Sequence, residues 1–276
     1  MTDLALSTAP PAHLPARGLR GDLRAVKIVW QRELMRVARD RPRLVTALLQ
    51  PLLYLFVLGT GMSALTAGGA SELRAFLFPG VMIMAVLFTS FFSAGSLVWD
   101  REFGFMREML VAPVGRGAIL LGKCLGGATA GALQGVIVLA AGALAGLPCA
   151  PGLVPVVVGE LLVAAFAVTA LGLLVAVRLR AIQSFMTVVQ LLVMPLFFLS
   201  GALYPLAALP PWLALLTRLD PLTYAVDPLR RAILGSADAG VSWAGWAVPP
   251  ALEVALVAAF GVAALVLATR LFARDE

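Results

Sequence analysis

The segment WDREFGFMREMLVAPVGR, Trp99–Arg116, is short and charged, and a long apolar stretch lies on each side of it. At helical spacing it has an apolar stripe and an opposite charged face. The stripe consists of Trp99, Phe103, Met106 and Leu110. Arg101 and Glu108 lie opposite the stripe, and Phe105 lies near them. We expect the stripe to rest on a membrane domain, leaving the charged face for a cytoplasmic partner.

The flanking composition predicts an all-α membrane protein. Apolar residues make up 61% of the 276 residues and charged residues only 13%, which is more apolar than a soluble domain of this size. Six stretches approach the roughly 20 residues that cross a bilayer, and no alternating strands typical of a barrel occur. The expected transmembrane helices are Leu44–Met62, Phe76–Val98, Ala118–Gly146, Val154–Val177, Val188–Leu206 and Pro249–Thr269.

Basic residues predict the orientation. Of the 21 Lys and Arg residues, 17 lie before the first span, in the second-to-third or fourth-to-fifth loops, or in the tail. The positive-inside rule therefore predicts a multi-pass protein of the cytoplasmic (inner) membrane with both termini in the cytoplasm. The isoelectric point near 10.1 then reflects topology and membrane-surface contact, and we expect no nucleic-acid partner.

The region before the first span divides into two parts. Residues 1–19 contain three prolines and no apolar core of a signal peptide, so we expect a disordered cytoplasmic tail. Residues 20–42 predict an amphipathic helix in the inner interface, with its basic side toward lipid phosphates. Its apolar stripe consists of Leu23, Val26, Trp30, Leu34 and Val37. The simpler alternative is a plain anchor before the span. Residues 43–276 form the expected six-span domain.

One apparent nucleotide motif fails. Gly117–Lys123 matches the first seven positions of a phosphate-binding loop, but Cys124 stands where Ser or Thr holds Mg²⁺. The segment also opens a membrane helix instead of following a buried strand. We therefore interpret Lys123 as an interfacial charge that reaches the inner leaflet, and we expect no catalytic, cofactor-binding or metal-binding residues on this chain.

Polar residues inside the predicted spans are candidate pathway or outer-gate groups, because such groups are costly in a membrane. They are Glu160, Glu253, Gln134 and Gln190. The alternative for the two acids is contact with outer headgroups or pairing with Arg230 or Arg231. For the glutamines we prefer interhelical hydrogen bonds to contact with substrate.

Two further patterns concern packing. Gly127, Gly131 and Gly135 form a small-residue ridge that allows another helix to approach closely. The outer segment 205–248 mixes apolar and charged residues, with Pro221 and Pro228 inside it. We interpret it as two short amphipathic helices that dip into the outer interface and are possible re-entrant elements.

Three stretches resemble ABC-2 type permeases. They are REFGFMREMLVAPVGRGAILLGK (101–123), VVQLLVMPLFFLSGALYPLAALP (188–210) and LDPLTYAVDPLRRAIL (219–234). The first is similar to the family's cytoplasmic loop. Its matching residues are Arg101, Glu102, Gly104, Glu108, Leu110, Pro113, Arg116, Gly122 and Lys123. Phe105 and Arg107 depart from the usual Thr and frequent Glu. The drug-resistance and nodulation-type exporters are the most similar subgroup.

The resemblance implies a division of labour. Two permeases pair, a homodimer being expected, and each binds a separate ABC ATPase that carries ATP and Mg²⁺. The loop 99–117 would contain the coupling helix, with Arg101, Glu102, Gly104, Phe105, Glu108, Pro113 and Arg116 as ATPase-coupling residues. This chain would not be an enzyme. It would export an amphipathic or lipid-like substrate, such as a drug or a lipid-linked oligosaccharide.

Two other function classes stay open at this point. A membrane-embedded enzyme acting on lipid-linked substrates would need clustered carboxylates, whereas Glu160 and Glu253 are far apart in sequence. An ATP-independent channel or facilitator would not need the charged amphipathic loop.

Overall fold

The computed structural model describes residues 19–58, 61, 69–106, 114–147, 151–206, 209–235, 240–243 and 246–275. The expected disordered tail lies outside these residues, apart from Leu19. The elements of the first half of the sequence are α1 (Leu19–Arg39), α2 (Arg41–Leu53), the π-helical η1 (Tyr54–Leu58), α4 (Gly69–Ala94), α5 (Ser96–Glu102) and α7 (Arg116–Leu144). They are followed by η3 (Pro151–Leu153), α8 (Val154–Arg178), α9 (Ile182–Leu199), α10 (Pro211–Leu219), α11 (Thr223–Leu234), β1 (Ser242–Trp243), β2 (Trp246–Ala247) and α12 (Pro250–Asp275).

The all-α membrane architecture is confirmed. Five described helices are long and apolar enough to cross a membrane: Glu72–Glu102, Arg116–Leu144, Val154–Arg178, Ile182–Leu199 and Pro250–Arg274. The first expected span corresponds to a shorter apolar helix, Val45–Val57. Pro51 lies inside α2, and the next turn widens into η1, because proline removes a backbone donor and disturbs the ladder of hydrogen bonds. The fifth helix begins six residues before its predicted start at Val188.

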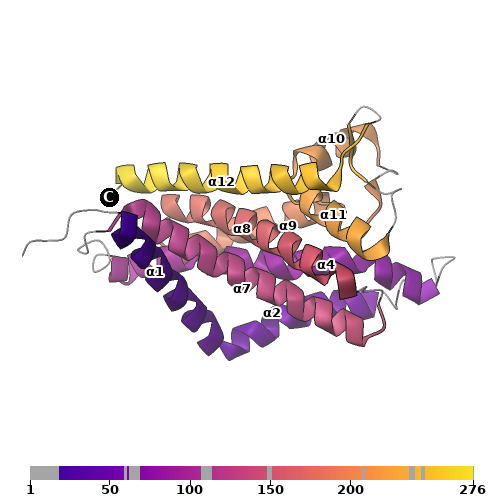
Figure 1. Ribbon diagram of the computed structural model, residues 1–276, viewed down its shortest axis with the longest axis horizontal. Helices are drawn as coiled ribbons and strands as arrows, with labels where there is room; N and C mark the ends of the chain where they lie inside the picture. Colours follow the sequence, from indigo (N-terminus) through magenta and orange to yellow (C-terminus); the bar gives the residue numbers. More distant parts are fainter. Residues whose placement is uncertain are drawn as a thin grey trace, which may run out of the picture.

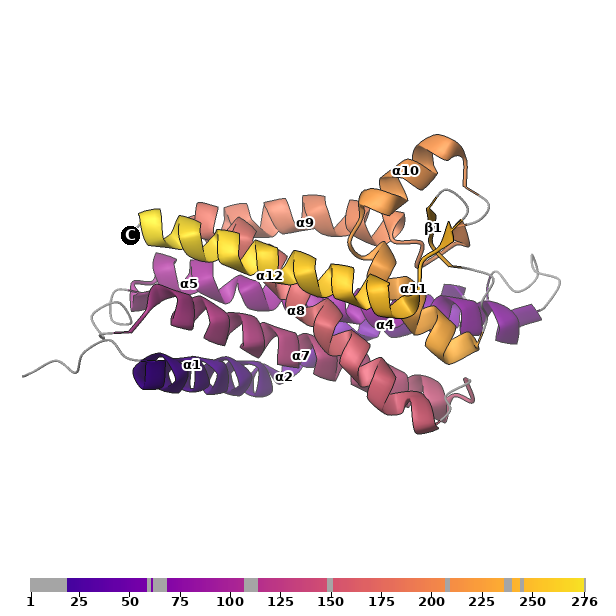
Figure 2. The ribbon, with the colours of Figure 1, turned by 45° about the horizontal axis from the view of Figure 1, so that its top comes forward.

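Helix α7 is packed tightly within the bundle, as the glycine ridge predicted. A Cβ at Gly127 would lie 2.5 Å from Thr169 of α8, and one at Gly131 would lie 2.2 Å from Ser90 of α4. Glycine therefore permits the close approach of three helices at these levels. Figures 1 and 2 show α4, α7, α8 and α12 running along the same long axis.

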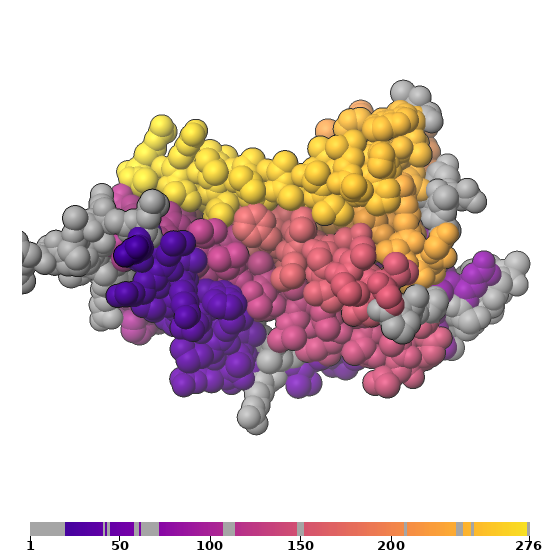
Figure 3. Space-filling model, viewed as in Figure 1, coloured from indigo at the N-terminus to yellow at the C-terminus, as the bar shows by residue number. Residues whose placement is uncertain are grey.

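The bundle has two different ends. The start of α1 and the end of α12 lie at one end, whereas α10, α11 and the β1–β2 hairpin cover the other (Figures 1 and 2). The space-filling view shows α12 along one edge and α1 on the opposite edge of the visible face (Figure 3). We call the α1 end the inner end and the α10–α11 end the outer end, following the expected orientation.

Helix α1 packs one side on the bundle and leaves part of its predicted apolar stripe exposed. Ala25, Val29 and Glu33 are buried, whereas Leu23, in the predicted lipid-facing stripe, is 68% exposed. The buried side packs on α7, where Gly126 leaves room for the Glu33 side chain: a Cβ at residue 126 would lie 2.5 Å from the Glu33 Cβ. Small residues on α7 and a fixed hydrogen bond from Trp30 Nε1 to Thr129 Oγ1 (3.1 Å) therefore determine which face is buried.

The outer segment divides into two unlike helices. Helix α10 exposes a row of large apolar side chains, Trp212, Leu215, Leu216 and Leu219, which suits the predicted contact with the outer interface. Helix α11 differs from the prediction, because every residue from Thr223 to Arg230 is buried. It packs against α4, α8 and α12 and closes the outer end of the bundle. The short β1–β2 hairpin was not predicted.

Candidate functional site

The inner loop begins as a continuation of the second span. Helix α5 buries Ser96, Leu97, Val98 and Asp100, and it ends near Gly104, which has φ +83°. Only part of the predicted apolar stripe rests on the bundle, and Leu110 lies outside the described residues. Trp99 and Phe103 are 46% and 56% exposed, although Met106 is buried. The turn at Gly104 ends the helix before the stripe is complete, because this left-handed conformation favours glycine.

Exposed aromatic groups instead mark this part of the loop. The Trp99 and Phe103 rings lie with their centroids 4.5 Å apart, and Phe105 is 50% exposed. Aromatic side chains of this kind are enriched at protein interfaces.

Two predicted coupling residues, Arg101 and Glu102, bind neighbouring segments of the chain. Arg101 donates to the Val177 and Leu179 carbonyl oxygens at 2.9 and 3.1 Å, at the end of α8. Glu102 Oε2 accepts the Ile182 N–H at 2.7 Å, at the start of α9. These contacts join the inner loop to the α8–α9 connection.

The other end of the loop is also attached. Arg116 donates to the Ala273 carbonyl oxygen at 2.8 Å, near the end of α12, and Gly115 N–H donates to Asp22 of α1 at 2.9 Å. The predicted coupling residues Glu108 and Pro113 lie outside the described residues. The structure thus positions both edges of the loop on the ends of several helices.

Lys123 is not at the lipid interface, and the prediction that it reaches the inner leaflet is wrong. It is 2% exposed, and its ammonium donates to Asp100 Oδ2 (2.6 Å), Glu33 Oε1 (2.8 Å) and Ser96 Oγ (3.0 Å). A buried ammonium needs such acceptors, and α1 and α5 both supply them. These contacts leave its three donor hydrogens occupied, which also argues against a nucleotide site.

Two arginines of α1 complete what we call the inner charge cluster, consisting of Arg32, Glu33, Arg36, Asp100 and Lys123. Arg36 Nη2 lies 2.9 Å from Asp100 Oδ1, and Arg32 contacts the same carboxylate. The guanidinium groups expected at lipid phosphates therefore pair with α5. Burial by itself would raise the pKa of Glu33, but Lys123, Arg36 and Arg32 together outweigh this effect and hold the pKa below its usual range.

Glu33 and Asp100 were missed as functional candidates in the sequence. Each stands close to basic residues in the sequence, a pattern typical of an ordinary surface charge. Their spacing from Lys123, 90 and 23 residues, gives no local signal. The close α1–α7 packing at Gly126 is the feature that brings them together.

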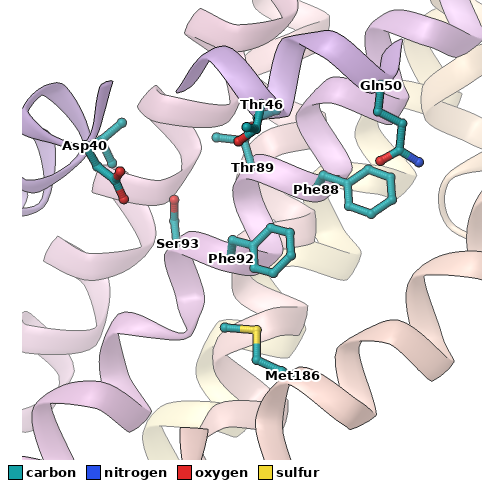
Figure 4. A pocket seen from close by; sticks show the side chains of 10 residues that line it. Asp40, Thr46, Gln50, Phe88, Thr89, Phe92, Ser93 and Met186 are labelled. Carbon is teal, nitrogen blue, oxygen red and sulfur yellow. The ribbon is translucent and has the colours of Figure 1, made fainter. Parts of the chain in front are cut away.

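A cavity adjoins this cluster between α1, α2, α4 and α9 (Figure 4). It has a volume of about 420 Å³, and a neighbouring cavity of about 370 Å³ shares Val37, Asp40, Phe92, Ser93 and Met186 with it. Phe88 and Phe92 project from α4, with ring centroids 6.4 Å apart. Glu33 and Arg36 line the second cavity, so the combined space has aromatic walls and a charged inner edge.

The predicted pathway residues do not gather in this cavity. Glu253 is fully buried at the outer end and lies 3.4 Å from Arg231, as one of the sequence alternatives held. Glu160 lines a small cleft with Tyr224, Val254 and Val257. Gln134 is buried in α7, and Gln190 is exposed on α9. Among the described residues, no group of three or more His, Cys, Asp or Glu side chains is arranged to hold a metal ion.

Comparison with known proteins identifies the family of this membrane protein. The inner membrane transport permease YadH of Escherichia coli (strain K12) is 28% identical over 218 residues, which cover 78% of this chain and 84% of the relative. Nodulation protein J of Neorhizobium galegae is 28% identical over 215 residues, covering 75% and 80%. The family model described as ABC-2 type transporter matches residues 24–234. This multi-pass membrane protein is therefore a transport permease that belongs to the ABC-2 type transporter family.

Proposed function

We propose that this chain is the membrane-spanning subunit of an ATP-driven exporter in the cytoplasmic membrane. Two copies pair, and each binds a separate ABC ATPase that hydrolyses ATP. The observation that carries the proposal is the attachment of the inner loop to α1, α7, the α8–α9 connection and α12. A force on this loop would reach several spans together, because ion pairs and hydrogen bonds join their inner ends.

The exposed aromatic side chains mark the expected ATPase contact. Trp99, Phe103 and Phe105 lie at the inner end, immediately before the segment that contains Glu108. A partner that covers them would bury apolar area, at roughly 25 cal/mol for each Å² removed from water. The charged residues Glu108 and Arg116 would then supply orientation and specificity.

The cavity suggests the kind of substrate. Phe88, Phe92 and Met186 offer an apolar surface, and Arg36, Glu33 and Asp40 lie at its inner edge. An amphipathic molecule could place its apolar part against the aromatic wall and its polar part toward the charges. A drug-like molecule or the lipid part of a lipid-linked oligosaccharide fits this description.

Co-purification with an ATPase tests the proposal. The tagged chain, solubilised from its own membrane, should retain an ABC ATPase, and Phe105→Ser should reduce the amount retained at least several-fold. Trp212→Ser is the control, because Trp212 is 64% exposed at the outer end. Equal retention of the ATPase by both variants would contradict the assigned contact, and absence of any ATPase from the wild-type complex would contradict the proposed function.

A further inference from the structure

Two carboxyl groups at the outer end converge on one guanidinium. Arg231 Nη2 lies 2.7 Å from Asp227 Oδ2 on α11 and 3.4 Å from Glu253 Oε1 on α12. Asp227 is 1% exposed and Glu253 is fully buried. We call Asp227, Arg231 and Glu253 the outer carboxyl cluster.

Each carboxyl group has a second oxygen without a donor. Asp227 Oδ1 and Glu253 Oε2 are buried, and neither has a hydrogen-bond partner if both groups are ionised. The two side chains nevertheless lie within hydrogen-bonding reach of each other. Two acceptors in contact, with no donor between them, are unfavourable in an environment that excludes water.

The surrounding charges do not remove this imbalance. Two other ionisable side chains face Glu253. Glu160 of α8 is a further carboxyl group, which adds negative charge, and Tyr224 of α11 adds no positive charge. Arg230 follows Asp227 by three residues in the sequence. Its Nη2 donates instead to the Gly201 and Ala202 carbonyl oxygens, and its guanidinium lies over the Phe76 ring. The outer half of α7 has no ionisable side chain. Arg231 is therefore the one cation among the described residues in contact with both carboxyl groups.

We propose that Asp227 and Glu253 share one proton, which forms a carboxyl–carboxylate hydrogen bond between α11 and α12. The proton supplies the missing donor and leaves a single negative charge opposite Arg231. Glu253, which is farther from the guanidinium, carries the proton and donates it to Asp227. The site is thus a binding site for one proton, and it does not depend on the proposed transport function.

The position of the cluster suggests what the proton does. Asp227 Oδ2 also accepts the Val241 N–H at 3.0 Å, and Arg231 Nη1 donates to the Val248 carbonyl oxygen at 2.9 Å. These bonds hold both sides of the β1–β2 hairpin against α11 and α12, which lie side by side at the outer end (Figure 2). Loss of the proton would place two anions against one cation and loosen this outer cover.

Infrared spectroscopy can detect the proton directly. A protonated carboxylic acid has a carbonyl stretching band that carboxylates and amides lack. At about pH 8, one unit above the pKa of Asp220, the buried carboxyl group of Asp220 is mostly ionised and contributes little to this band. The purified wild-type permease should show the band at this pH, and Glu253→Gln should remove it.

The Asp227→Asn variant distinguishes a proton shared by two carboxyl groups from a Glu253 that is protonated only because it is buried. Without the second carboxylate, Glu253 becomes the sole ion-pair partner of Arg231 and should ionise, so the band should disappear here as well. Glu160→Gln is the matched control and should keep the band. A band that is absent from the wild type, persists in Asp227→Asn or disappears only in Glu160→Gln would overturn the proposal. Elution as a single symmetrical peak in size-exclusion chromatography confirms that each variant is folded. Glu253→Gln and Asp227→Asn test the proposal independently, because each should remove the band.

Discussion

Lys123 and Asp100 form an ion pair inside the helix bundle, with Nζ and Oδ2 2.6 Å apart and both side chains 1% exposed. Asp100 belongs to the inner loop segment and Lys123 to the centre of the inner packing between α1 and α7. The pair therefore connects the loop where a partner is proposed to bind with the helices that would have to move. This connection leads to the first prediction.

Lys123→Met should destabilise the permease by about 3 to 5 kcal/mol, because it leaves buried carboxylates without their ammonium partner. Lys123→Arg should also lower the melting temperature, since a larger planar group has no room among Glu33, Ser96 and Asp100. Thermal unfolding in detergent measures both effects. Adding Asp100→Asn to Lys123→Met should restore part of the loss. An unchanged melting temperature of Lys123→Met would contradict a buried ion pair between Lys123 and Asp100.

Gly126→Ala should weaken the α1–α7 contact by about 1 to 3 kcal/mol, because its new Cβ would lie 2.5 Å from the Glu33 Cβ. Gly159→Ala on α8 is the control, since a Cβ there meets nothing within 4 Å. That change should be neutral or add up to about 1 kcal/mol through helix propensity. The melting temperatures of the two variants, each compared with that of the wild type, test this prediction. Equal effects of the two substitutions would contradict the close approach of α1 and α7 at Gly126.

Asp220 should make stability depend on pH. Burial raises its pKa from 3.8 to about 7, so the folded state holds the proton more tightly than the unfolded state does. The free energy of unfolding should therefore fall as the pH rises from about 4 to about 7, by up to about 4 kcal/mol, and this contribution should then level off.

Asp220→Asn should remove this dependence, because the amide oxygen can still accept the Leu222 N–H and never ionises. The variant should melt above the wild type at neutral pH and match it in acid. Parallel pH profiles for the two proteins would contradict the assignment to Asp220.

Single-cysteine labelling should place the two ends of the bundle on opposite sides of the membrane. In a background with Cys124→Ala and Cys149→Ser, Phe103→Cys and Ser242→Cys provide exposed sites at the inner and outer ends. An impermeant maleimide added to intact cells should label residue 242 and spare residue 103. The reverse pattern would invert the topology derived from the basic residues.

Much of the fold could be predicted from the sequence, because the length of an apolar stretch and the position of basic residues can be read without knowing which helices pack together. Helix α8 begins at Val154, as predicted, and the Gly127–Gly131–Gly135 ridge lies at a three-helix contact. The interior of α11 was harder to predict. Its charged residues Asp227 and Arg230 resemble surface residues in sequence, and only tertiary hydrogen bonds and ion pairs make their burial acceptable.

The candidate site was less predictable than the fold. Arg101 and Glu102 were identified, but their contacts with Leu179 and Ile182 depend on where the α8–α9 connection lies in space. The burial of Lys123 depends on two carboxylates from other helices. Periodicity within one helix reveals which residues share a face, but it does not reveal what covers that face.

Distance measurement between two copies of the permease tests the central claim most directly. A spin label at Arg180→Cys, an exposed position in the α8–α9 connection of each copy, gives the separation of these two inner loops by pulsed electron resonance. The complex with its ATPase is held in lipid nanodiscs. The account predicts one distance without nucleotide and a shorter one with ATP and a hydrolysis-deficient ATPase, and no such change without the ATPase. A complex that binds ATP while the distance between the loops stays the same, or a chain that shows no second copy, would contradict an ATP-driven paired permease.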